Sequence, residues 1–309
     1  MIEIHPCAEE ADERVALEIH NAVQPRDAIT IDEVNSFKSS MRDYVDHLAR
    51  IDGSVAGSAA GAIRPQRPDR VFALVTVLAE HRRHGVGSAL YQVVSRWAAE
   101  RGLDAMESWV EEDDAESITF AEQRGFAEIE RNGRMVLDLA AVGELGVEPP
   151  AGIEIVTWAE RPELDHGLYD VACEANPDIP GFEQERMEPF EDWLAHEMRG
   201  SGDLPEATFV ALAGDEVVGY AKFSLTAARP RVAAHDLTGV KRAWRGRGIA
   251  GALKRAQIAW AKREGYERLE TANEMRNEPI RRLNARLGYR PAPGRIFLLG
   301  PLSARARGT

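Results

Sequence analysis

The sequence predicts two similar α/β domains in one chain, each built on a mixed, mostly antiparallel sheet flanked by helices. The first observation is length, because 309 residues suffice for about two domains of ordinary size. The second is composition: 44% apolar and 29% charged residues are typical of chains that bury a core. The third is an internal repeat, whose copies show strand and helix patterns in the same order.

The repeat aligns residues 77–126 with residues 240–289 without a gap. A single match means little, but one register holds arginine, glycine and tryptophan identities together. The identical pairs include Arg82/Arg245, Gly85/Gly248, Trp97/Trp260, Gly102/Gly265 and Gly125/Gly288. We therefore expect two copies of one domain.

The first copy is predicted to open with a strand at residues 2–4, followed by one or two helices and an antiparallel hairpin over about residues 44–63. Asp52-Gly53 marks the hairpin turn, because this pair readily adopts the left-handed backbone that such turns need. The second copy repeats the strand, the hairpin and the turn at residues 153–157, 208–225 and 214–215.

The second part of each copy is predicted to be a βαβ unit and a short helix. In the first copy a strand at 72–78 precedes a helix over about 85–101, whose apolar residues recur at spacings of three and four. A strand at 104–110 and a helix ending at Gly125-Phe126 follow. The matching elements of the second copy lie at 234–241, 248–264, 268–271 and before Gly288-Tyr289.

The joint between the copies is predicted at residues 146–152. Pro149 and Pro150 stand there among small residues, cannot continue a helix and suit an exposed linker. The predicted domains are residues 1–146 and 153–309.

Charge and cysteine content exclude several classes of protein. A net charge of −13 argues against a nucleic-acid partner and suits an enzyme with cationic substrates, although acidity also serves solubility alone. Cys7 and Cys173 cannot form a disulfide framework, and no Cys/His spacing predicts a metal site. With no secretory signal and no apolar run of about 18 residues, we expect a cytoplasmic protein without a membrane partner.

Two turns between a strand and a helix carry the predicted chemistry. Both follow the pattern Arg-x-x-Gly-x-Gly/Ala, at residues 82–87 and 245–250. A helix N-terminus offers unpaired N–H groups and the positive end of the helix dipole. Glycine lets phosphate oxygens approach the backbone, and arginine adds charge-assisted hydrogen bonds. The pattern therefore predicts two phosphate sites; for either turn alone, an ordinary glycine-containing turn is the alternative.

Other phosphate motifs fit less well. The chain has no G-x-x-x-x-G-K-[ST] sequence, which excludes a P-loop. Gly246-x-Gly248-x-x-Gly251 matches the dinucleotide fingerprint, with Glu267 and Glu270 further on, so a nicotinamide enzyme stays open as an alternative. That fingerprint normally opens several further parallel strands, and the first copy lacks its outer glycines.

On these turns and the closing motifs, both halves of the chain resemble the GNAT superfamily of N-acyltransferases. The fit is strongest in the second copy, where Thr238-Gly239-Val240 precedes the turn and Asn277 follows it. The resemblance implies that acetyl-CoA or another acyl-CoA binds without a metal, with its pyrophosphate on the turn and its pantetheine along the preceding strand. The residues implied to bind it are Val240, Arg242, Arg245, Gly246, Arg247, Gly248, Ile249, Ala250, Gly251 and Asn277 in the second copy, and Val77, Arg82, Arg83, His84, Gly85, Val86, Gly87 and Ser88 in the first.

Both copies also depart from the family pattern. Asp114 stands where Asn277 stands in the second copy, and a carboxylate lacks the amide donor. Many family members have a tyrosine that protonates the leaving thiolate, and the alignment places Ala121 and Asn284 at that position. The usual general acid is therefore missing from both halves. Asn284 is instead assigned to the substrate site.

Three further expectations concern the acceptor. An attacking amine must lose its proton to a base, and Asp236 is predicted to be that base or a substrate anchor; a surface carboxylate is the alternative. Strand alternation predicts that Asp236, Thr238 and Val240 share one face and that His235 lies on the other. Asp178 is predicted to meet a cationic amine, with a solvated turn as the alternative; acidic residues follow it at Glu183, Glu185 and Glu188.

The sequence thus predicts a tandem GNAT protein that transfers acetyl from acetyl-CoA to a primary amine of a small molecule. We expect the C-terminal half to be the catalyst, and the N-terminal half to bind acyl-CoA without turnover or to support the fold. Two fused domains can make, within one chain, the contact that two single-domain chains make in a dimer. We therefore expect a monomer. The alternatives are a non-catalytic acyl-CoA sensor, a mycothiol-synthase-like enzyme and an aminoglycoside-type acetyltransferase.

Overall fold

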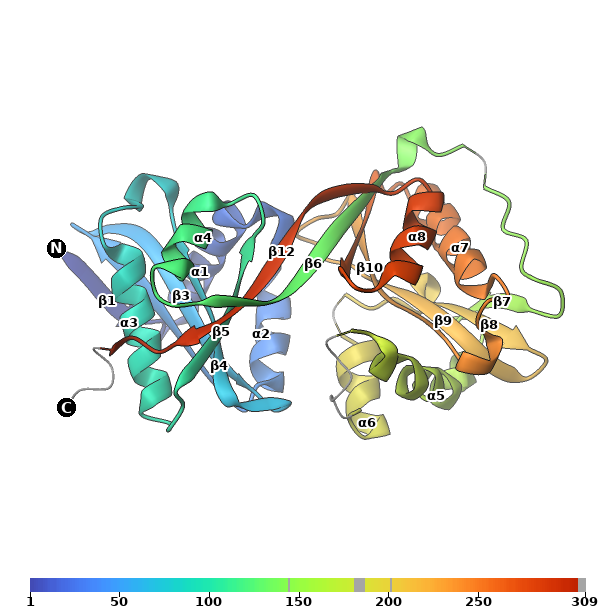
Figure 1. Ribbon diagram of the computed structural model, residues 1–309, viewed down its shortest axis with the longest axis horizontal. Coiled ribbons are helices and arrows are strands. Elements are labelled where there is room, and N and C mark those ends of the chain that lie inside the picture. Colours follow the sequence, from blue (N-terminus) through green and yellow to red (C-terminus); the bar gives the residue numbers. More distant parts are fainter. Residues whose placement is uncertain (144, 181–186, 201, 305–309) are drawn as a thin grey trace. The chain divides into compact units, whose positions relative to one another are not determined.

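The computed structural model describes residues 1–143, 145–180, 187–200 and 202–304, and the chain divides into two compact units (Figure 1). The first unit comprises residues 1–131 and the segment that begins at Arg295; the second comprises residues 132–294. Both units are mixed α/β, which confirms the predicted fold class.

The sheet of the first unit has the strand order β1-β2-β3-β4-β5-β12. Strands β4 and β5 are parallel and are connected through α3, which is the predicted βαβ unit. Asp52 and Gly53 have φ values of 50° and 83° and form the predicted turn between β2 and β3. The elements are β1 (Ile2–Pro6), α1 (Glu10–Val23), a 3₁₀ turn (Pro25–Asp27), α2 (Ile31–Ser40), β2 (Asp43–Ile51), β3 (Ser54–Arg64), β4 (Arg67–Val77), a 3₁₀ turn (Ala79–His81), α3 (Val86–Ala99), β5 (Ala105–Glu111), α4 (Ala115–Glu122), β6 (Ala127–Asp138) and β12 (Arg290–Pro301). Most of β6 and the 3₁₀ turn that follows it (Leu139–Ala141) belong to the second unit.

The sheet of the second unit has the order β6-β11-β10-β9-β8-β7. Here β10 and β11 are parallel and are connected through α7. The elements are β7 (Glu154–Thr157), a 3₁₀ turn (Pro162–Leu164), α5 (Asp165–Ala175), a 3₁₀ turn (Asn176–Asp178), α6 (Phe190–Trp193), a π-helical turn (Leu194–Met198), a 3₁₀ turn (Pro205–Ala207), β8 (Phe209–Ala213), β9 (Glu216–Ser224), β10 (Val232–Val240), a 3₁₀ turn (Arg242–Trp244), α7 (Ile249–Arg263), β11 (Arg268–Glu274) and α8 (Glu278–Arg286).

The closing strand of each sheet comes from the other repeat. Residues 132–138 of β6 pair antiparallel with β11, and residues 295–301 of β12 pair antiparallel with β5. The compact units therefore do not divide at the predicted joint near 146–152, and they differ from the predicted ranges 1–146 and 153–309. The physical reason is that β6 and β12 have a similar pattern of apolar residues. The sequence near the joint therefore does not determine which of the two sheets β6 joins and which β12 joins.

Buried side chains cover both faces of the second sheet. Along β9, Val218 and Ala221 pack in one apolar cluster with α7, while Val217 and Tyr220 pack in another with α5. Neighbouring residues point to opposite faces, as the pleat of a strand requires. A register shift between β8 and β9 places Val218 and Ala221 on one face although they are three residues apart. The α5 and α7 helices therefore cover different faces of this sheet.

A β-bulge in β10 changes which residues share a face. His235 pairs with Phe223 and Thr238 pairs with Ala221, so two residues of β10 stand opposite Lys222 alone. As a result Val240 packs in the α7 cluster, whereas Asp236 bonds to Lys222 on the other face. The prediction that Asp236 and Val240 share one face was wrong, because an extra residue reverses the alternation.

Polar side chains are buried between β10 and α7. His235 contacts Gln257 Oε1 through Nδ1 at 3.0 Å and the Tyr289 hydroxyl through Nε2. Burial lowers the pKa of His235, and the charge of Lys254 lowers it further. Lys254 is 1% exposed, lies 5.7 Å from the centre of the Tyr289 ring, and has a pKa lowered to about 7 by burial. These residues belong to the core.

Lys254→Met should stabilise the protein at pH 7 by about 1–4 kcal/mol, because an apolar side chain replaces a charge in an apolar site. The folded-state pKa of Lys254 is about 7, below its ordinary value of 10.5. Between these values the unfolded chain binds a proton that the folded chain does not, so stability rises with pH by ~1.4 kcal/mol per pH unit. Urea unfolding at pH 7, 8 and 9 should show this slope in the wild type and lose it in the variant. An equal slope in both proteins would contradict this expectation.

Candidate active site

Each unit has a gap between its two parallel strands. In the first unit β4 pairs with β5 at Val71 and Phe72, after which β4 continues to Val77 without that partner. In the second, β10 pairs with β11 over residues 232–235 and then continues to Val240. Because the strands diverge, backbone groups at the ends of β4 and β10 are available to a ligand lying in the gap.

Each gap leads to the N-terminus of a long helix. Gly85 and Gly248 precede α3 and α7 with φ values of 87° and 85°, and no side chain caps either helix. The left-handed backbone explains the glycine, since a β-carbon there costs about 1–2 kcal/mol. The first arginine of each turn is structural as well, because Nε of Arg82 and Arg245 donates to the carbonyl that ends the preceding strand, at 3.5 and 2.9 Å.

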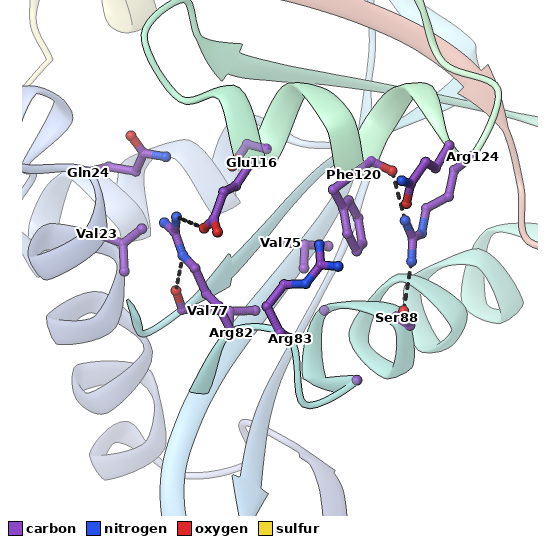
Figure 2. Close-up of a pocket in the computed structure, with 14 residues that line it drawn as sticks. Val23, Gln24, Val75, Val77, Arg82, Arg83, Ser88, Glu116, Phe120 and Arg124 are labelled. Carbon is purple, nitrogen blue, oxygen red and sulfur yellow. Dashed lines mark hydrogen bonds and ion pairs between the residues drawn. The ribbon is translucent and has the colours of Figure 1, made fainter. Parts of the chain in front are cut away.

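The first unit contains a pocket at this turn (Figure 2). It encloses about 340 Å³, and Val75, Val77 and Phe120 supply apolar walls. The C-terminal end of α1 supplies Val23 and Gln24. Of the residues predicted to bind the cofactor in this copy, those that line the pocket are Val77, Arg82, Arg83, Gly85, Gly87 and Ser88.

Arg124 completes this pocket, and the sequence interpretation gave it no role there. Its guanidinium donates to Ser88 Oγ and to the Phe120 carbonyl, both at 2.7 Å, and lies 3.4 Å from the centre of the Phe120 ring. Burial lowers the pKa of Arg124. No carboxylate contacts Arg124 among the described residues, whereas Arg82 is paired with Glu116 at 2.9 Å. Arg124 therefore offers a positive charge to an anion in the pocket.

Arg83 has an unusual backbone. Its φ is 64°, in the left-handed region, where the second copy has Gly246 with a φ of 76°. A non-glycine residue in this region stores strain, and such residues cluster at binding sites. Two other predicted residues lie close by: His84 Nδ1 donates to the Arg82 carbonyl at 2.8 Å, and Val86 is buried.

Asp114 has a structural role in the first unit. Its carboxylate caps α4 by accepting from the Ser117 backbone N–H at 3.0 Å and from the Ser117 hydroxyl at 2.8 Å. Asn277 at the matching position precedes α8 and makes no capping hydrogen bond through its side chain. The amide of Asn277 is thus available to a ligand, unlike the carboxylate of Asp114.

In the second unit, Asp178 binds the arginines of the turn. Its carboxylate accepts from Arg242 at 2.8 Å and from Arg245 at 2.7 Å, and these contacts lower its pKa to about 2. Glu174 also accepts a hydrogen bond from the Arg242 backbone N–H. Asp178 therefore lies beside the predicted phosphate site rather than in an open acceptor site, because the two guanidinium groups attract it.

Asp178→Asn should tighten acetyl-CoA binding to the second unit by about two- to fivefold. The substitution removes a negative charge that competes with phosphate for Arg242 and Arg245, and exposed ion pairs of this kind contribute up to ~1 kcal/mol. Calorimetric titration of the variant against the wild type measures the change. Weaker binding would mean that Asp178 holds the arginines in the binding position.

The remaining residues of the second turn lie at or near the start of α7. Arg247 stacks on Trp244 at 4.6 Å and donates to the Ala243 carbonyl at 3.2 Å. Gly246 has open space where a β-carbon would lie, which leaves room for a phosphate group. Ile249 and Gly251 are buried and Ala250 is half-buried, so these three residues can contribute backbone N–H groups rather than side chains.

Asn284 is fully buried on α8. Its Nδ2 donates to Asn273 Oδ1 at 2.9 Å, while its own Oδ1 has no partner among the described residues. A buried acceptor without a partner is costly, which is the usual reason for a bound water or ligand at such a point. Ala121, the matching residue of the first unit, is also buried and offers no polar group.

A charged cluster lies on the α5 and α6 face of the second sheet. Buried Lys222 donates to Asp203 at 2.6 Å, to Asp236 at 2.8 Å and to the carbonyl of Glu197. Burial lowers the pKa of Lys222, but the charges of Asp236 and Asp203 outweigh it and raise that pKa above its ordinary value. Desolvation and the Asp236 charge raise the pKa of Glu197.

Sequence reasoning found Asp236 but missed its partners. Lys222, Asp203 and Glu197 come from three other segments, and a polar residue within an otherwise buried strand was the available signal for Lys222. Of the acidic residues that follow Asp178, Glu188 contacts His196 at 3.0 Å, and Glu183 and Glu185 lie outside the described residues. In the described ranges, no helix is long and apolar enough to cross a membrane and no metal-binding group is present.

The chain thus contains the same arrangement twice: a gap between parallel strands that ends at an uncapped helix N-terminus with a left-handed glycine. The family model described as "Acetyltransferase (GNAT) family" matches residues 13–126 and 166–289. The chain therefore belongs to the GNAT acetyltransferase family and is an acyltransferase.

The chain is similar to tandem proteins of known structure. A tandem GNAT protein from the clavulanic acid biosynthesis pathway matches with a TM-score of 0.78 and 21% identity over 98% of this chain and 99% of that chain. A GCN5-related N-acetyltransferase from Sphaerobacter thermophilus matches with a TM-score of 0.74 and 22% identity over 97% and 96%. These likenesses establish the shared fold.

One relative is similar in sequence over a shorter region. The L-2,4-diaminobutyric acid acetyltransferase of Nocardia farcinica (strain IFM 10152) is 32% identical over 103 residues, which are 33% of this chain and 51% of that protein. The chain thus spans about half the length of this relative.

Proposed function

We propose that this acyltransferase moves acetyl from acetyl-CoA to a primary amine of a small molecule. The second unit is the catalyst in this proposal, and the first unit also binds acyl-CoA. The observation that carries the proposal is the repeated arrangement of a parallel-strand gap and a helix N-terminus behind Gly85 or Gly248. Such a helix end favours the negative charge of a pyrophosphate.

The residues at each turn fit this donor. In the second unit, N–H groups at the start of α7 and the side chains of Arg245 and Arg247 would hold the pyrophosphate, and backbone groups near Val240 would hold the pantetheine. Asn277 would contact the pantetheine arm through its amide. In the first unit, Arg83 and Arg124 add positive charge to a pocket with apolar walls.

The charges on the α5 and α6 face of the second sheet, where Asp236 lies, support a cationic amine as the acceptor. Lys222 is one positive charge against the carboxylates of Asp203 and Asp236, and Glu197 lies beside them. An excess of negative charge attracts an ammonium group. The name of the Nocardia farcinica relative identifies a diamino acid as the substrate of that protein, which supports a small diamine or diamino acid here.

Asp236 is the proposed base. Its carboxylate would accept a hydrogen bond from the incoming ammonium group and take the proton directly or through water. Lys222 holds this carboxylate in place through an ion pair at 2.8 Å. Glu197 is a second candidate, because a raised pKa makes a carboxylate a better base. A thiol of ordinary pKa, about 8.5, leaves as a thiolate near neutral pH without a tyrosine.

A non-catalytic acyl-CoA sensor is the second candidate function. The observation that favours it is the absence of an acidic side chain at Ala121 and Asn284, where many family members carry a tyrosine. Turnover of any amine would exclude this function.

The test is thiol release from acetyl-CoA across a panel of amines that includes L-2,4-diaminobutyrate. We expect calorimetry to show between one and two acetyl-CoA molecules per chain, and thiol release with at least one cationic amine. Absence of binding by both acetyl-CoA and CoA would reject the proposal. Binding without release for every amine would support the sensor.

A further inference from the structure

A histidine lines the strand gap of the first unit. The gap holds a cavity of about 80 Å³, bounded by β4 from Ala73 to Thr76 and by β5 from Ser108 to Val110. His20, in the last turn of α1, and Gln24, the residue that follows this helix, line the cavity. Ala121 lines it as well. This cavity lies where the proposed function puts the end of the pantetheine arm.

The hydrogen bonds of His20 indicate which nitrogen is basic. Its Nε2 lies 3.0 Å from the carbonyl oxygen of Asp27. A carbonyl can only accept, so Nε2 carries the hydrogen and Nδ1 carries the lone pair in the neutral ring. Nδ1 forms no hydrogen bond with any residue that the structure describes. The ring is thus held by one nitrogen and leaves the other able to accept a proton.

The partner of His20 is itself fixed. The Asp27 carboxylate lies 3.7 Å from Nε2, where it would stabilise a protonated ring. Arg295 of β12 binds this carboxylate at 2.6 Å, and Arg26 anchors the same 3₁₀ turn to Glu111 at 3.0 Å. A histidine whose ring is held through one nitrogen by a hydrogen bond, with a fixed carboxylate close by, resembles the arrangement of an enzymatic base.

The second unit has no equivalent of this histidine. Each first helix is followed by a 3₁₀ turn that contains a proline, Pro25 or Pro177. His20 stands five residues before Pro25, and the residue five positions before Pro177 is the buried Ala172. The two units therefore differ in the group that could accept a proton from the acceptor.

We propose that the first unit is a second acetyl-transfer centre, in which His20 Nδ1 is the general base. This rests on the proposed binding of acetyl-CoA in the first unit, and it replaces the expectation that this unit lacks turnover. The acceptor is a primary amine that reaches the thioester through the gap between β4 and β5.

The step balances with His20 and water. Nδ1 takes a proton from the ammonium form of the acceptor, and the neutral amine attacks the thioester carbonyl carbon. A C–N bond forms, the C–S bond breaks, and the electron pair leaves on sulfur. The nitrogen of the adduct loses its second proton to water. The protonated ring returns its proton to the thiolate, directly or through a water, which yields an amide, the free thiol and one proton released to the solvent. Tyr91, the other titratable side chain lining the cavity, donates its hydroxyl hydrogen to the Pro301 carbonyl at 2.7 Å.

The experiment uses the full chain with Gly248→Glu, a substitution that should prevent acetyl-CoA from binding at the turn of the second unit. We expect this variant to bind one acetyl-CoA and to release thiol with at least one amine of the panel. Adding His20→Gln should lower that kcat by at least ~100-fold, the range of a general base. Gln keeps an amide donor for the Asp27 carbonyl but has no basic nitrogen. His5→Gln is the matched control, a histidine on β1 away from the cavity, and should leave kcat unchanged.

Two outcomes separate this inference from the proposed function. If Gly248→Glu binds acetyl-CoA but releases no thiol with any amine, or if His20→Gln leaves kcat unchanged, the inference is wrong and acyl-CoA binding stands. If no acetyl-CoA binds to Gly248→Glu, the site proposed for the first unit fails as well. If His20→Gln also loses acetyl-CoA binding, the deciding variant is His20→Gly measured with added imidazole. Recovery of kcat by imidazole supports the inference, and no recovery overturns it.

Discussion

Gly248→Glu is expected to weaken acetyl-CoA binding to the second unit by at least ~100-fold, or about 3 kcal/mol. Gly248 has a φ of 85°, so a β-carbon there is strained. The new carboxylate would also lie at the N-terminus of α7, where it would satisfy the N–H groups that the pyrophosphate needs and repel it. The number of acetyl-CoA molecules bound per chain, measured by calorimetry, should fall to the number bound by the first unit.

Gly265→Glu is the matched control for this prediction. Gly265 has a φ of 82°, follows the other end of α7 and has open space where a β-carbon would lie. The control therefore carries similar backbone strain and the same added charge but lies away from the turn. It should bind acetyl-CoA like the wild type. Equal losses of acetyl-CoA binding in both variants would show that backbone strain alone is responsible. Normal binding by Gly248→Glu would show that the turn is not part of the acetyl-CoA site.

Asp236→Asn is expected to lower kcat of the second unit by ~10²–10⁴, because it removes the proposed base. The affinity for acetyl-CoA should change little, since Asp236 lies on the opposite face of the sheet from α7. The measurement is kcat for one accepted amine in a Gly85→Glu background, so that turnover by the first unit does not contribute.

Two variants test whether the loss is chemical. Asp203→Asn removes the other carboxylate that binds Lys222, so it disturbs the same buried charge while retaining Asp236. We expect it to keep most of the activity. Asn284→Ala should lower kcat less than about tenfold, below the range of an acid–base group. If Asn284→Ala is inactive and Asp236→Asn is near normal, the assignment of the base is wrong, and the amide of Asn284 would have to hold the thioester, the thiolate or a water.

The two phosphate turns could be predicted because their conformation is local. Gly85 and Gly248 adopt a left-handed backbone that glycine tolerates best, and the apolar spacing of the following residues indicates a helix. Residues a few positions apart therefore carry the whole signal. Whether phosphate binds at either turn stays a prediction.

The partners of the charged groups could not be predicted in this way. Asp178 meets Arg242 and Arg245, and Asp236 meets Lys222, through contacts between segments distant in the chain. The bulge in β10 also depends on its pairing with β9, so alternation along β10 alone placed Asp236 on the wrong face relative to Val240.

By itself the sequence determined that the chain is a repeat, the order of strands and helices in each copy, and the two turns, because backbone preference and apolar spacing act over short distances. Only the tertiary structure decided which sheet β6 and β12 join, which carboxylates hold the arginines, and that His20 lines the gap in the first unit. These outcomes depend on pairing and packing between residues far apart in the chain, and similar local patterns are compatible with more than one partner.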